Sequence, residues 1–494
     1  MSGSTGDRSG WNVLRLPASH DGFCLAHGEE FDSTDPTDGS LVAVMRSSTL
    51  QDVDAAVDRA QHALRTCDWR NNGAIRARVL LRFAERVRAN VDRLAELLTR
   101  EQGKLLREAR TEVLQTAEMV EFYAGLSRVI YGRAIALGDN AHGVVLREPI
   151  GIVGVITPWN WPLVLMVRAV APALAAGNAV IVKPASLTPA ITTATLALLA
   201  EDPDLPEGIL TLILGSGAVV GDALVGHSGV GMIAFTGESS TGINVMKRAA
   251  DDLRKVSLEL GGKSPNIVFA DANLDKAVDG ALNAAFATTG QICTSGSRLL
   301  LEDSIHDQFL ARLTDRVKAY RLGDPLRSDT TMAPLVSSGQ QRSVQAYVEI
   351  GHQDGTLVVA GNLPEDPALA EGAFVAPTIF CDLPATSRLV QEEVFGPVLA
   401  VQRFADEDEA LRIADDTEFG LAAGIWTTNL DRAWRVGRAV HAGSIWINTY
   451  HHFYSETEVG GFRKSGVGRQ QGLDGLLEFT ETKHLNFDHS PTLW

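Results

Sequence analysis

The sequence contains few cysteines, and none of them form a close pair. Cys24, Cys67, Cys293 and Cys381 are widely separated among the 494 residues. This spacing fits neither a disulfide framework nor a zinc site, so we expect no bound metal. Unpaired thiols are typical of a reducing compartment, and a cytoplasmic location is the simpler prediction.

Long apolar runs are also missing. The most apolar stretch, residues 150–182, is interrupted by Asn160, Arg168, Asn178 and three prolines. No segment approaches the length of a membrane-spanning helix, and no membrane association is predicted. Residues 1–10 lack an apolar segment, so we expect no signal peptide there.

Positive charge is in deficit. Lys and Arg total 44 against 61 Asp and Glu, which gives a formal net charge of −17. A basic face is what nucleic-acid binding requires, so nucleic acid is not expected as a partner. The 45% hydrophobic and 21% charged residues are typical of a globular protein with a large core.

The first 150 residues are predicted to be mainly helical after an irregular start over 1–45. Thr49 and Asp52 form a capping box that opens a helix running to about Leu64. Helical periodicity continues over 75–128, with Gly103 as a break. Residues 130–149 are predicted to form two short strands around a turn.

Short apolar runs then alternate with helical segments. The runs lie at 151–156, 179–182, 209–214, 230–235, 255–260, 266–269, 297–302, 397–404, 421–426 and 444–448. This alternation predicts βαβ units and parallel sheets. We therefore expect two α/β domains that meet near residue 260.

Two strand-to-helix junctions are candidate phosphate sites. Gly215, Gly217 and Gly221 follow one strand, and the segment 236–239 follows the next. Glycines allow close approach of a phosphate, and ligands bind at the carboxyl ends of parallel strands. A tight turn without a ligand explains the first junction equally well, because its spacing is not the strict dinucleotide fingerprint.

Three polar side chains are candidates for chemistry. Cys293 lies on a loop among small and polar residues, a poor setting for core packing and a suitable one for a nucleophile. Glu259 ends an apolar strand, where it is either salt-bridged or raised in pKa. Asn160 follows the first strand of the α/β region and either donates to an oxyanion or caps the next helix.

Seven motifs occur in the order and spacing of the aldehyde dehydrogenase superfamily, over about residues 30 to 487: TPWNWP, KPAS, FTGESSTG, LELGGKSP, GQICTSGSR, EEVFGP and GGFRKSGVGR. The sequence resembles that family. The resemblance implies an α/β fold with two parallel-sheet domains and a small β oligomerisation flap. The implied boundaries are 1–129 with 150–260 for cofactor binding, 261–474 for catalysis, and 130–149 with 475–494 for the flap.

The resemblance implies the oxidation of an aldehyde to a carboxylic acid with NAD(P). Cys293 matches the nucleophile that forms a thiohemiacetal and then a thioester. Asn160 matches the oxyanion donor, and Glu259 matches the residue that activates water for hydrolysis. Further matches imply cofactor contacts at Trp159, Lys183, Ser186, Gly217, Gly221, Gly237, Ser239, Leu260, Glu393 and Phe395.

Two departures from the family pattern concern the cofactor and the proton path. NAD-preferring relatives commonly carry a glutamate where this chain has Ser186, and a hydroxyl beside Lys183 does not repel a 2′-phosphate. We therefore expect NADP to be accepted. Gln470 stands where relatives usually have a glutamate, so a proton relay through that position is lost.

The aldehyde itself is less well determined by the sequence. The matched substrate positions are Trp161, Leu165, Arg168, Ile292, Thr294 and Phe453. Arg168 replaces a common tryptophan and either binds a substrate carboxylate or forms an internal ion pair. The aromatic loop 448–455 favours a flat or ring-bearing aldehyde, so an aromatic, ring-bearing or semialdehyde substrate is expected.

Other functions stay open on the sequence alone. A coenzyme A-acylating semialdehyde dehydrogenase shares the motifs, although Glu259 favours release of the free acid. A binding protein without turnover is disfavoured by the intact Cys293, Glu259 and Asn160, and esterase chemistry would be a side activity. The flap implies a homodimer or homotetramer.

Overall fold

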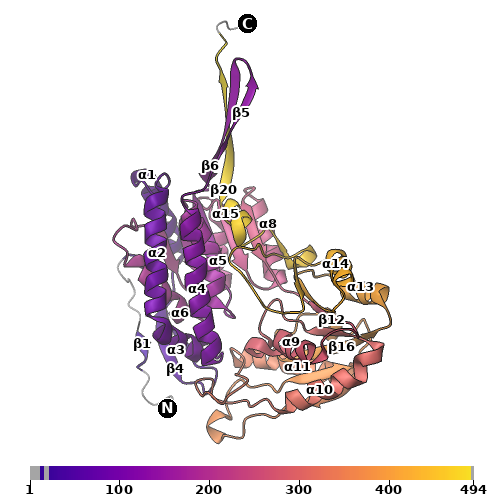
Figure 1. Cartoon of the computed structure of the whole chain (residues 1–494). Helices are drawn as coiled ribbons and strands as arrows, with labels where there is room; N and C mark the ends of the chain where they lie inside the picture. The colour runs from indigo at the N-terminus through magenta and orange to yellow at the C-terminus, as the bar shows by residue number, and fades with distance from the viewer. Residues whose placement is uncertain (1–11, 16–21, 491–494) are drawn as a thin grey trace.

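Two seven-stranded sheets organise the chain, with helices packed on their faces (Figure 1). The computed structural model describes residues 12–15 and 22–490. Two further sheets have three strands each. The predicted α/β class with parallel sheets is confirmed, because nearly all neighbouring strands in the two large sheets run parallel.

The first large sheet has the strand order β19-β11-β10-β7-β8-β9-β2. Its strands are β2 (Cys24–Leu25), β7 (Ile152–Ile156), β8 (Ala179–Lys183), β9 (Leu210–Ile213), β10 (Met232–Thr236), β11 (Lys255–Glu259) and β19 (Gly466–Val467). From β7 the chain builds outward through β8 and β9, and then returns to the other side of β7 with β10. Strand order therefore reverses between β7 and β10, and such a switch point is where open α/β sheets bind ligands.

The second large sheet has the strand order β14-β15-β16-β13-β12-β17-β18. Its strands are β12 (Pro265–Val268), β13 (Arg298–Glu302), β14 (Thr356–Ala360), β15 (Thr378–Cys381), β16 (Val398–Phe404), β17 (Ala422–Trp426) and β18 (Ser444–Ile447). Only β14 runs antiparallel to its neighbour. The chain passes from β11 in the first large sheet to β12 in the second through a short glycine-containing segment.

Four helices cover the N-terminal part: α1 (Leu50–Thr66), α2 (Gly73–Ala89), α3 (Val91–Gln102) and α4 (Leu106–Leu126). The predicted capping box of Thr49 and Asp52 is present at the start of α1. The predicted break at Gly103 is also present, because this residue ends α3 with a φ of 92°. A second break at Asn90 separates α2 from α3 and was not predicted.

The expectation of an irregular start is wrong for part of the chain. Strands β1 (Leu14–Arg15), β3 (Glu30–Thr34) and β4 (Leu41–Arg46) form a small sheet, and β2 joins the first large sheet. The turn residues that dominate this region separate short strands. The remaining helices are α5 (Pro162–Ala175), α6 (Pro189–Ala200), α7 (Asp222–Gly226), α8 (Ser239–Ala250), α9 (Leu274–Phe286), α10 (His306–Lys318), α11 (Ser338–Asp354), α12 (Arg388–Gln391), α13 (Glu407–Asp415), α14 (Leu430–Ala439) and α15 (Gly472–Leu477).

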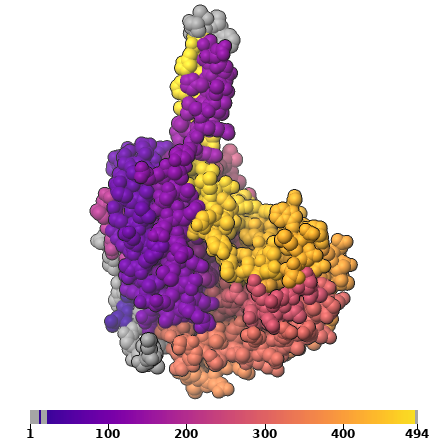
Figure 2. All heavy atoms as spheres, in the orientation of Figure 1, coloured from indigo at the N-terminus to yellow at the C-terminus, as the bar shows by residue number. Residues whose placement is uncertain are grey.

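A three-stranded arm projects from the body of the molecule (Figures 1 and 2). It consists of the predicted hairpin, β5 (Arg133–Gly138) and β6 (Ala141–Pro149), with the C-terminal strand β20 (Thr480–Asp488) paired antiparallel to β6. Among the described residues, no helix combines the length and the apolar character needed to cross a bilayer.

Candidate active site

The carboxyl-terminal edge of the first sheet supplies one side of the site. The strands are in register there: Ile156 pairs with Lys183, and Thr236 pairs with Glu259. The second sheet supplies the other side from the loops that lead into its strands. Cys293 lies on the loop between a 3₁₀ turn (Ala287–Gly290) and β13.

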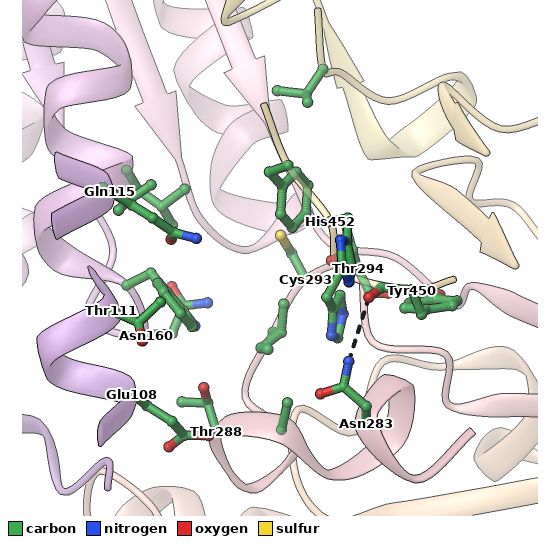
Figure 3. Close-up of a pocket in the computed structure, with 18 of the residues that line it drawn as sticks. Glu108, Thr111, Gln115, Asn160, Asn283, Thr288, Cys293, Thr294, Tyr450 and His452 are labelled. Atoms are coloured by element: carbon green, nitrogen blue, oxygen red, sulfur yellow. Dashed lines mark hydrogen bonds between the residues drawn. The ribbon is translucent and has the colours of Figure 1, made fainter. Parts of the chain in front are cut away.

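A cavity of about 1150 Å³ brings the three predicted catalytic residues together. Asn160, Glu259 and Cys293 all line it. In Figure 3 the sulfur of Cys293 points toward the open space, and α4 carries Glu108, Thr111 and Gln115 on the opposite wall. Residues far apart in sequence therefore converge on one space.

Cys293 is a free, half-buried thiol held by a strained loop. Thr288 and Thr289 both have positive φ values, 48° and 55°, and Gly290 continues the left-handed segment at 73°. Positive φ is rare for a threonine, so the surrounding contacts must hold this loop. Burial raises the pKa of the Cys293 thiol to about 11, and the nearby charge of Arg168 acts in the opposite direction.

Asn160 is held beside the nucleophile by the loop that carries Cys293. Its side chain, 3% exposed, donates from Nδ2 to the Gln291 carbonyl at 2.9 Å. An amide nitrogen carries two N–H groups, so one is left for a ligand. The alternative role as a helix cap is wrong, because Trp161 is the N-cap of α5 and the Asn160 amide donates to the Gln291 carbonyl instead.

A buried ion pair supports the Asn160 loop, and it was not predicted. Lys104 Nζ donates to Glu112 and also to the Asn160 carbonyl, the latter at 2.8 Å. Glu112 Oε1 accepts from the backbone N–H of Leu163 at 2.8 Å. The sequence signal that could have found this pair is a glutamate on the otherwise apolar face of α4.

Glu259 is a buried carboxylate that forms no salt bridge with any residue that the structure describes. Its side chain is 4% exposed, and Oε1 has no hydrogen-bond partner among the described residues. Burial raises its pKa to about 7, more than the charges of Arg168 and Arg469 lower it. The structural salt-bridge alternative is therefore wrong, and a carboxyl group that titrates near neutrality is suited to general base catalysis.

All the predicted substrate residues line the same cavity: Trp161, Leu165, Arg168, Ile292, Thr294 and Phe453. The aromatic loop also contributes His451, His452 and Tyr454. Tyr450 also lines the cavity; it is largely buried, and its hydroxyl donates to the Thr294 carbonyl at 2.9 Å. The contribution of α4 to the cavity was not predicted, because its residues are distant in the chain from every motif.

The predicted cofactor residues lie outside this cavity, around the edge of the first sheet. Lys183 ends β8, and burial lowers the pKa of its ammonium group to about 8. Ser186 is exposed, and its hydroxyl donates to the Gly215 carbonyl at 3.0 Å. Gly217 and Gly221 bound a single helical turn, and the space beside Gly217 is open.

Gly237 and Ser239 lie at the junction of β10 with α8. No side chain caps this helix, so backbone N–H groups of its first turn can receive a phosphate. The Ser239 hydroxyl itself donates to the Lys464 carbonyl at 3.2 Å. Leu260 packs against Gly242 of the same helix, which keeps the helix close to the sheet.

Glu393 and Phe395 reach this edge from the second sheet. Glu393 accepts from the Gly262 N–H at 3.2 Å, and a Cβ on Gly261 would overlap its carboxylate. Phe395 packs edge-to-face on Trp159, with ring centroids 5.2 Å apart. This edge therefore presents a buried lysine, an open glycine turn, a helix N-terminus with available N–H groups, and a carboxylate beside two glycines. Together these groups fit a dinucleotide.

Known proteins resemble the chain over nearly its full length. The model of the "Aldehyde dehydrogenase family" matches residues 23–485. Betaine aldehyde dehydrogenase from Bacillus subtilis (strain 168) is 41% identical over 459 residues, which cover 92% of this chain and 94% of that protein.

Solved structures agree with this match. The crystal structure of a putative aldehyde dehydrogenase from Burkholderia cenocepacia has a TM-score of 0.92 and 40% identity, and covers 94% of this chain and 95% of that one. Betaine aldehyde dehydrogenase from Staphylococcus aureus in complex with NAD⁺ also has a TM-score of 0.92, with 35% identity and 94% and 93% coverage. The chain belongs to the aldehyde dehydrogenase family and oxidises an aldehyde to a carboxylic acid with NAD(P).

Proposed function

We propose that Cys293 is the nucleophile of this reaction and that Asn160 and Glu259 assist it. The observation that carries the proposal is that a thiol, an amide with a free N–H and an unpaired carboxylate line one cavity. The thiolate of Cys293 attacks the aldehyde carbon and forms a thiohemiacetal. The Asn160 amide donates to the oxygen that becomes negative in this step.

Oxidation and hydrolysis follow at the same sulfur. NAD(P), when bound, accepts the hydride that leaves the thiohemiacetal carbon, which becomes a thioester. Glu259 then takes a proton from water, the water oxygen bonds to the acyl carbon, and the carbon–sulfur bond breaks to release the acid. Trp159, Lys183, Gly217, Gly221, Gly237, Leu260, Glu393 and Phe395 would hold the cofactor, with the N–H groups around Ser239 near its phosphates.

Cysteine variants test this assignment. Cys293→Ala should lose aldehyde oxidation, measured as the absorbance of reduced cofactor, because no other group lines the cavity as a thiol. Its affinity for NAD⁺, measured by fluorescence quenching, should stay within about twofold. Cys67→Ala is the matched control, since Cys67 is also free and half-buried. Steady oxidation by Cys293→Ala would refute the proposal.

NADP is proposed as a second cofactor because Ser186, not a carboxylate, stands beside Lys183. The hydroxyl has its acceptor in Gly215 and brings no negative charge toward a 2′-phosphate. Ser186→Glu should therefore lower kcat/KM for NADP more than for NAD. A preference of the unaltered enzyme for NAD above ~10³, over about 4 kcal/mol, would contradict the proposal.

The assembly and location proposed here are a homodimer or homotetramer in the cytoplasm. The arm presents exposed apolar side chains on β5 and β20, including Leu137 and Phe487, which favours contact with another copy. Four free cysteines support a reducing location. The proposed domains are 1–129 with 150–260, 261–474, and the arm, 130–149 with 475–494. Of the strands that the structure describes, only β19 belongs to the second domain by its number and pairs within the first large sheet.

A bulky, ring-bearing aldehyde is the proposed substrate class. Phe453 and His451 lie near parallel at the cavity, 6.4 Å apart, and offer a flat surface. Betaine aldehyde is a second candidate, supported by the 41% identity to a betaine aldehyde dehydrogenase and by the exposed Glu118 and Glu456 at the cavity. Comparison of kcat/KM for benzaldehyde and betaine aldehyde separates the two.

A further inference from the structure

An acidic residue, Glu238, is the N-cap of α8 at the cofactor edge of the first sheet. The first N–H groups of a helix have no partner within the helix. In α8 the first backbone hydrogen bond runs from the Gly242 N–H to the Glu238 carbonyl at 2.9 Å, so the N–H groups of residues 239–241 lack helical partners. A carboxylate therefore stands at the place where these groups would receive a phosphate.

The carboxylate of Glu238 does not cap its own helix. A side-chain oxygen at the N-cap position commonly accepts from an N–H of the first turn, but Glu238 makes no such bond. Its Oε1 accepts from the Ser240 hydroxyl at 2.7 Å instead. Ser240 thus keeps the negative charge beside the first turn of α8 and leaves the N–H groups there available.

No basic group neutralises Glu238 in the part of the chain that the structure describes. The neighbouring cations are paired with other carboxylates, Arg248 with Asp251 and Lys464 with Glu418. The Glu238 side chain is exposed, and an exposed glutamate is ionised at neutral pH. The start of α8 therefore carries one uncompensated negative charge.

The charge of Glu238 also acts on Glu393, the second carboxylate of the cofactor edge. Glu393 comes from the other sheet and accepts from the Gly262 N–H at 3.2 Å. Burial raises the pKa of Glu393 to about 7, and the charge of Glu238 acts in the same direction. The field of Glu238 therefore extends into the space where the cofactor residues of both sheets converge.

We propose that Glu238 lowers the affinity of the enzyme for NAD(P) by repelling its phosphate groups, and that it thereby speeds release of the reduced cofactor. This inference rests on the proposed cofactor site, because it assumes that the phosphates meet the start of α8. Like charges at short range repel, so the free N–H groups bind the phosphates against this repulsion. The helix start attracts the cofactor, and Glu238 limits how tightly it is held.

Glu238→Gln is the direct test, because it removes the charge, keeps the size of the side chain and can still accept from Ser240. Dissociation constants for NAD⁺ and NADH are measured by fluorescence. The buffer contains EDTA, so that no divalent cation bridges the carboxylate and the phosphates. Both constants should fall by about threefold or more. A smaller decrease for either form of the cofactor would overturn the inference.

Salt dependence and release rate distinguish charge repulsion from a change of shape. The Debye length shortens from about 10 Å at 0.1 M salt to about 3 Å at 1 M, so the ratio of the parent to the Glu238→Gln dissociation constant should approach one as NaCl is added. Release of NADH, followed by stopped-flow fluorescence after mixing with excess NAD⁺, should be about twofold or more slower in Glu238→Gln. A ratio that salt does not change, or an unaltered release rate, would contradict the proposed role.

Glu201→Gln is the matched control for net charge. Glu201 is also exposed and forms no salt bridge with a described residue, but it is the C-cap of α6. That helix begins just after Ser186, so Glu201 lies at its other end, away from the cofactor edge. The control should bind NAD⁺ and NADH as the parent does. A change as large as that of Glu238→Gln would assign the effect to net charge and overturn the inference.

Two variants of Ser239 test whether the phosphates lie at α8. Proline is well tolerated at the first position of a helix, and Glu238 already has the extended ψ, 142°, that residues before proline adopt. Ser239→Pro therefore removes one N–H from the helix start, whereas Ser239→Ala removes only the hydroxyl that donates to the Lys464 carbonyl. If Ser239→Pro binds NAD⁺ as tightly as Ser239→Ala, the proposed cofactor site fails. If it binds more weakly and Glu238→Gln does not bind more tightly, only the role of Glu238 is wrong.

Discussion

Glu259→Gln is the variant that most sharply separates the two halves of the proposed reaction. The substitution keeps the size of the side chain and removes its capacity to take a proton. Within the described part of the chain Glu259 has no salt bridge to break, and its Oε1 has no hydrogen-bond partner, so the fold should tolerate the amide. Formation of the thioester needs Cys293 and the cofactor, whereas its hydrolysis needs a base.

The expected fall in kcat of Glu259→Gln, and the expected pH dependence of kcat in the unaltered enzyme, follow from the role and the environment of this carboxylate. General base catalysis contributes about 10²–10⁴, so steady-state kcat should fall by about that factor. The pKa of Glu259 is raised to about 7 by burial. The ionised fraction of such a group grows from about one tenth at pH 6 to about nine tenths at pH 8. Where hydrolysis limits the rate, kcat of the unaltered enzyme should therefore rise about tenfold from pH 6 to pH 8, and that of Glu259→Gln should not follow this curve.

Stopped-flow absorbance of the reduced cofactor is the assay. Glu259→Gln should give a burst of about one equivalent per site, followed by slow turnover. Glu118→Gln is the matched control, since this carboxylate also lines the cavity but is exposed; its ratio of burst rate to steady rate should match the parent. Full steady activity of Glu259→Gln, with the same pH dependence, would refute the role assigned to the carboxylate.

Three further predictions concern the groups around the sulfur. Asn160→Ala should lower kcat by about 10²–10³ with little change in cofactor affinity, because one oxyanion donor is lost; an unchanged kcat would contradict this role. Lys104→Met should lower the free energy of unfolding by about 3–5 kcal/mol in urea titrations, because it leaves the Glu112 carboxylate buried alone, and addition of Glu112→Gln should restore most of it. Burial raises the pKa of the Cys293 thiol to about 11, so the thiolate fraction increases with pH; kcat/KM should rise from pH 6 to 9, and a decline over that range would argue against thiolate attack.

Local sequence signals predicted the regular parts of the fold. The capping box at Thr49 and the left-handed Gly103 depend on neighbouring residues alone, and both are present. The break at Asn90 carried no glycine or proline signal and was missed. Strand β19 has two residues and pairs with β11 from more than 200 residues away, a contact that no local pattern encodes.

The candidate site likewise contains residues that local motifs predicted and residues whose roles depend on distant contacts. Motifs indicated Cys293, Asn160 and Glu259, and the structure brings them to one cavity. The sequence could not decide whether each residue is structural or chemical, because that depends on its contacts, such as the lack of a hydrogen-bond partner for Glu259 Oε1 among the described residues. The Lys104–Glu112 ion pair was not predicted, because its role depends on the contact that Glu112 makes with the N–H of Leu163 at the start of α5.

The central claim is that the acyl group is carried on one sulfur atom. Mass spectrometry of Glu259→Gln, quenched in acid after the cofactor burst, tests it directly. The peptide that contains Cys293 should gain the mass of the acyl group, and the gain should disappear after treatment with hydroxylamine. A burst without a mass gain on that peptide, or with the acyl group on another residue, would contradict the mechanism.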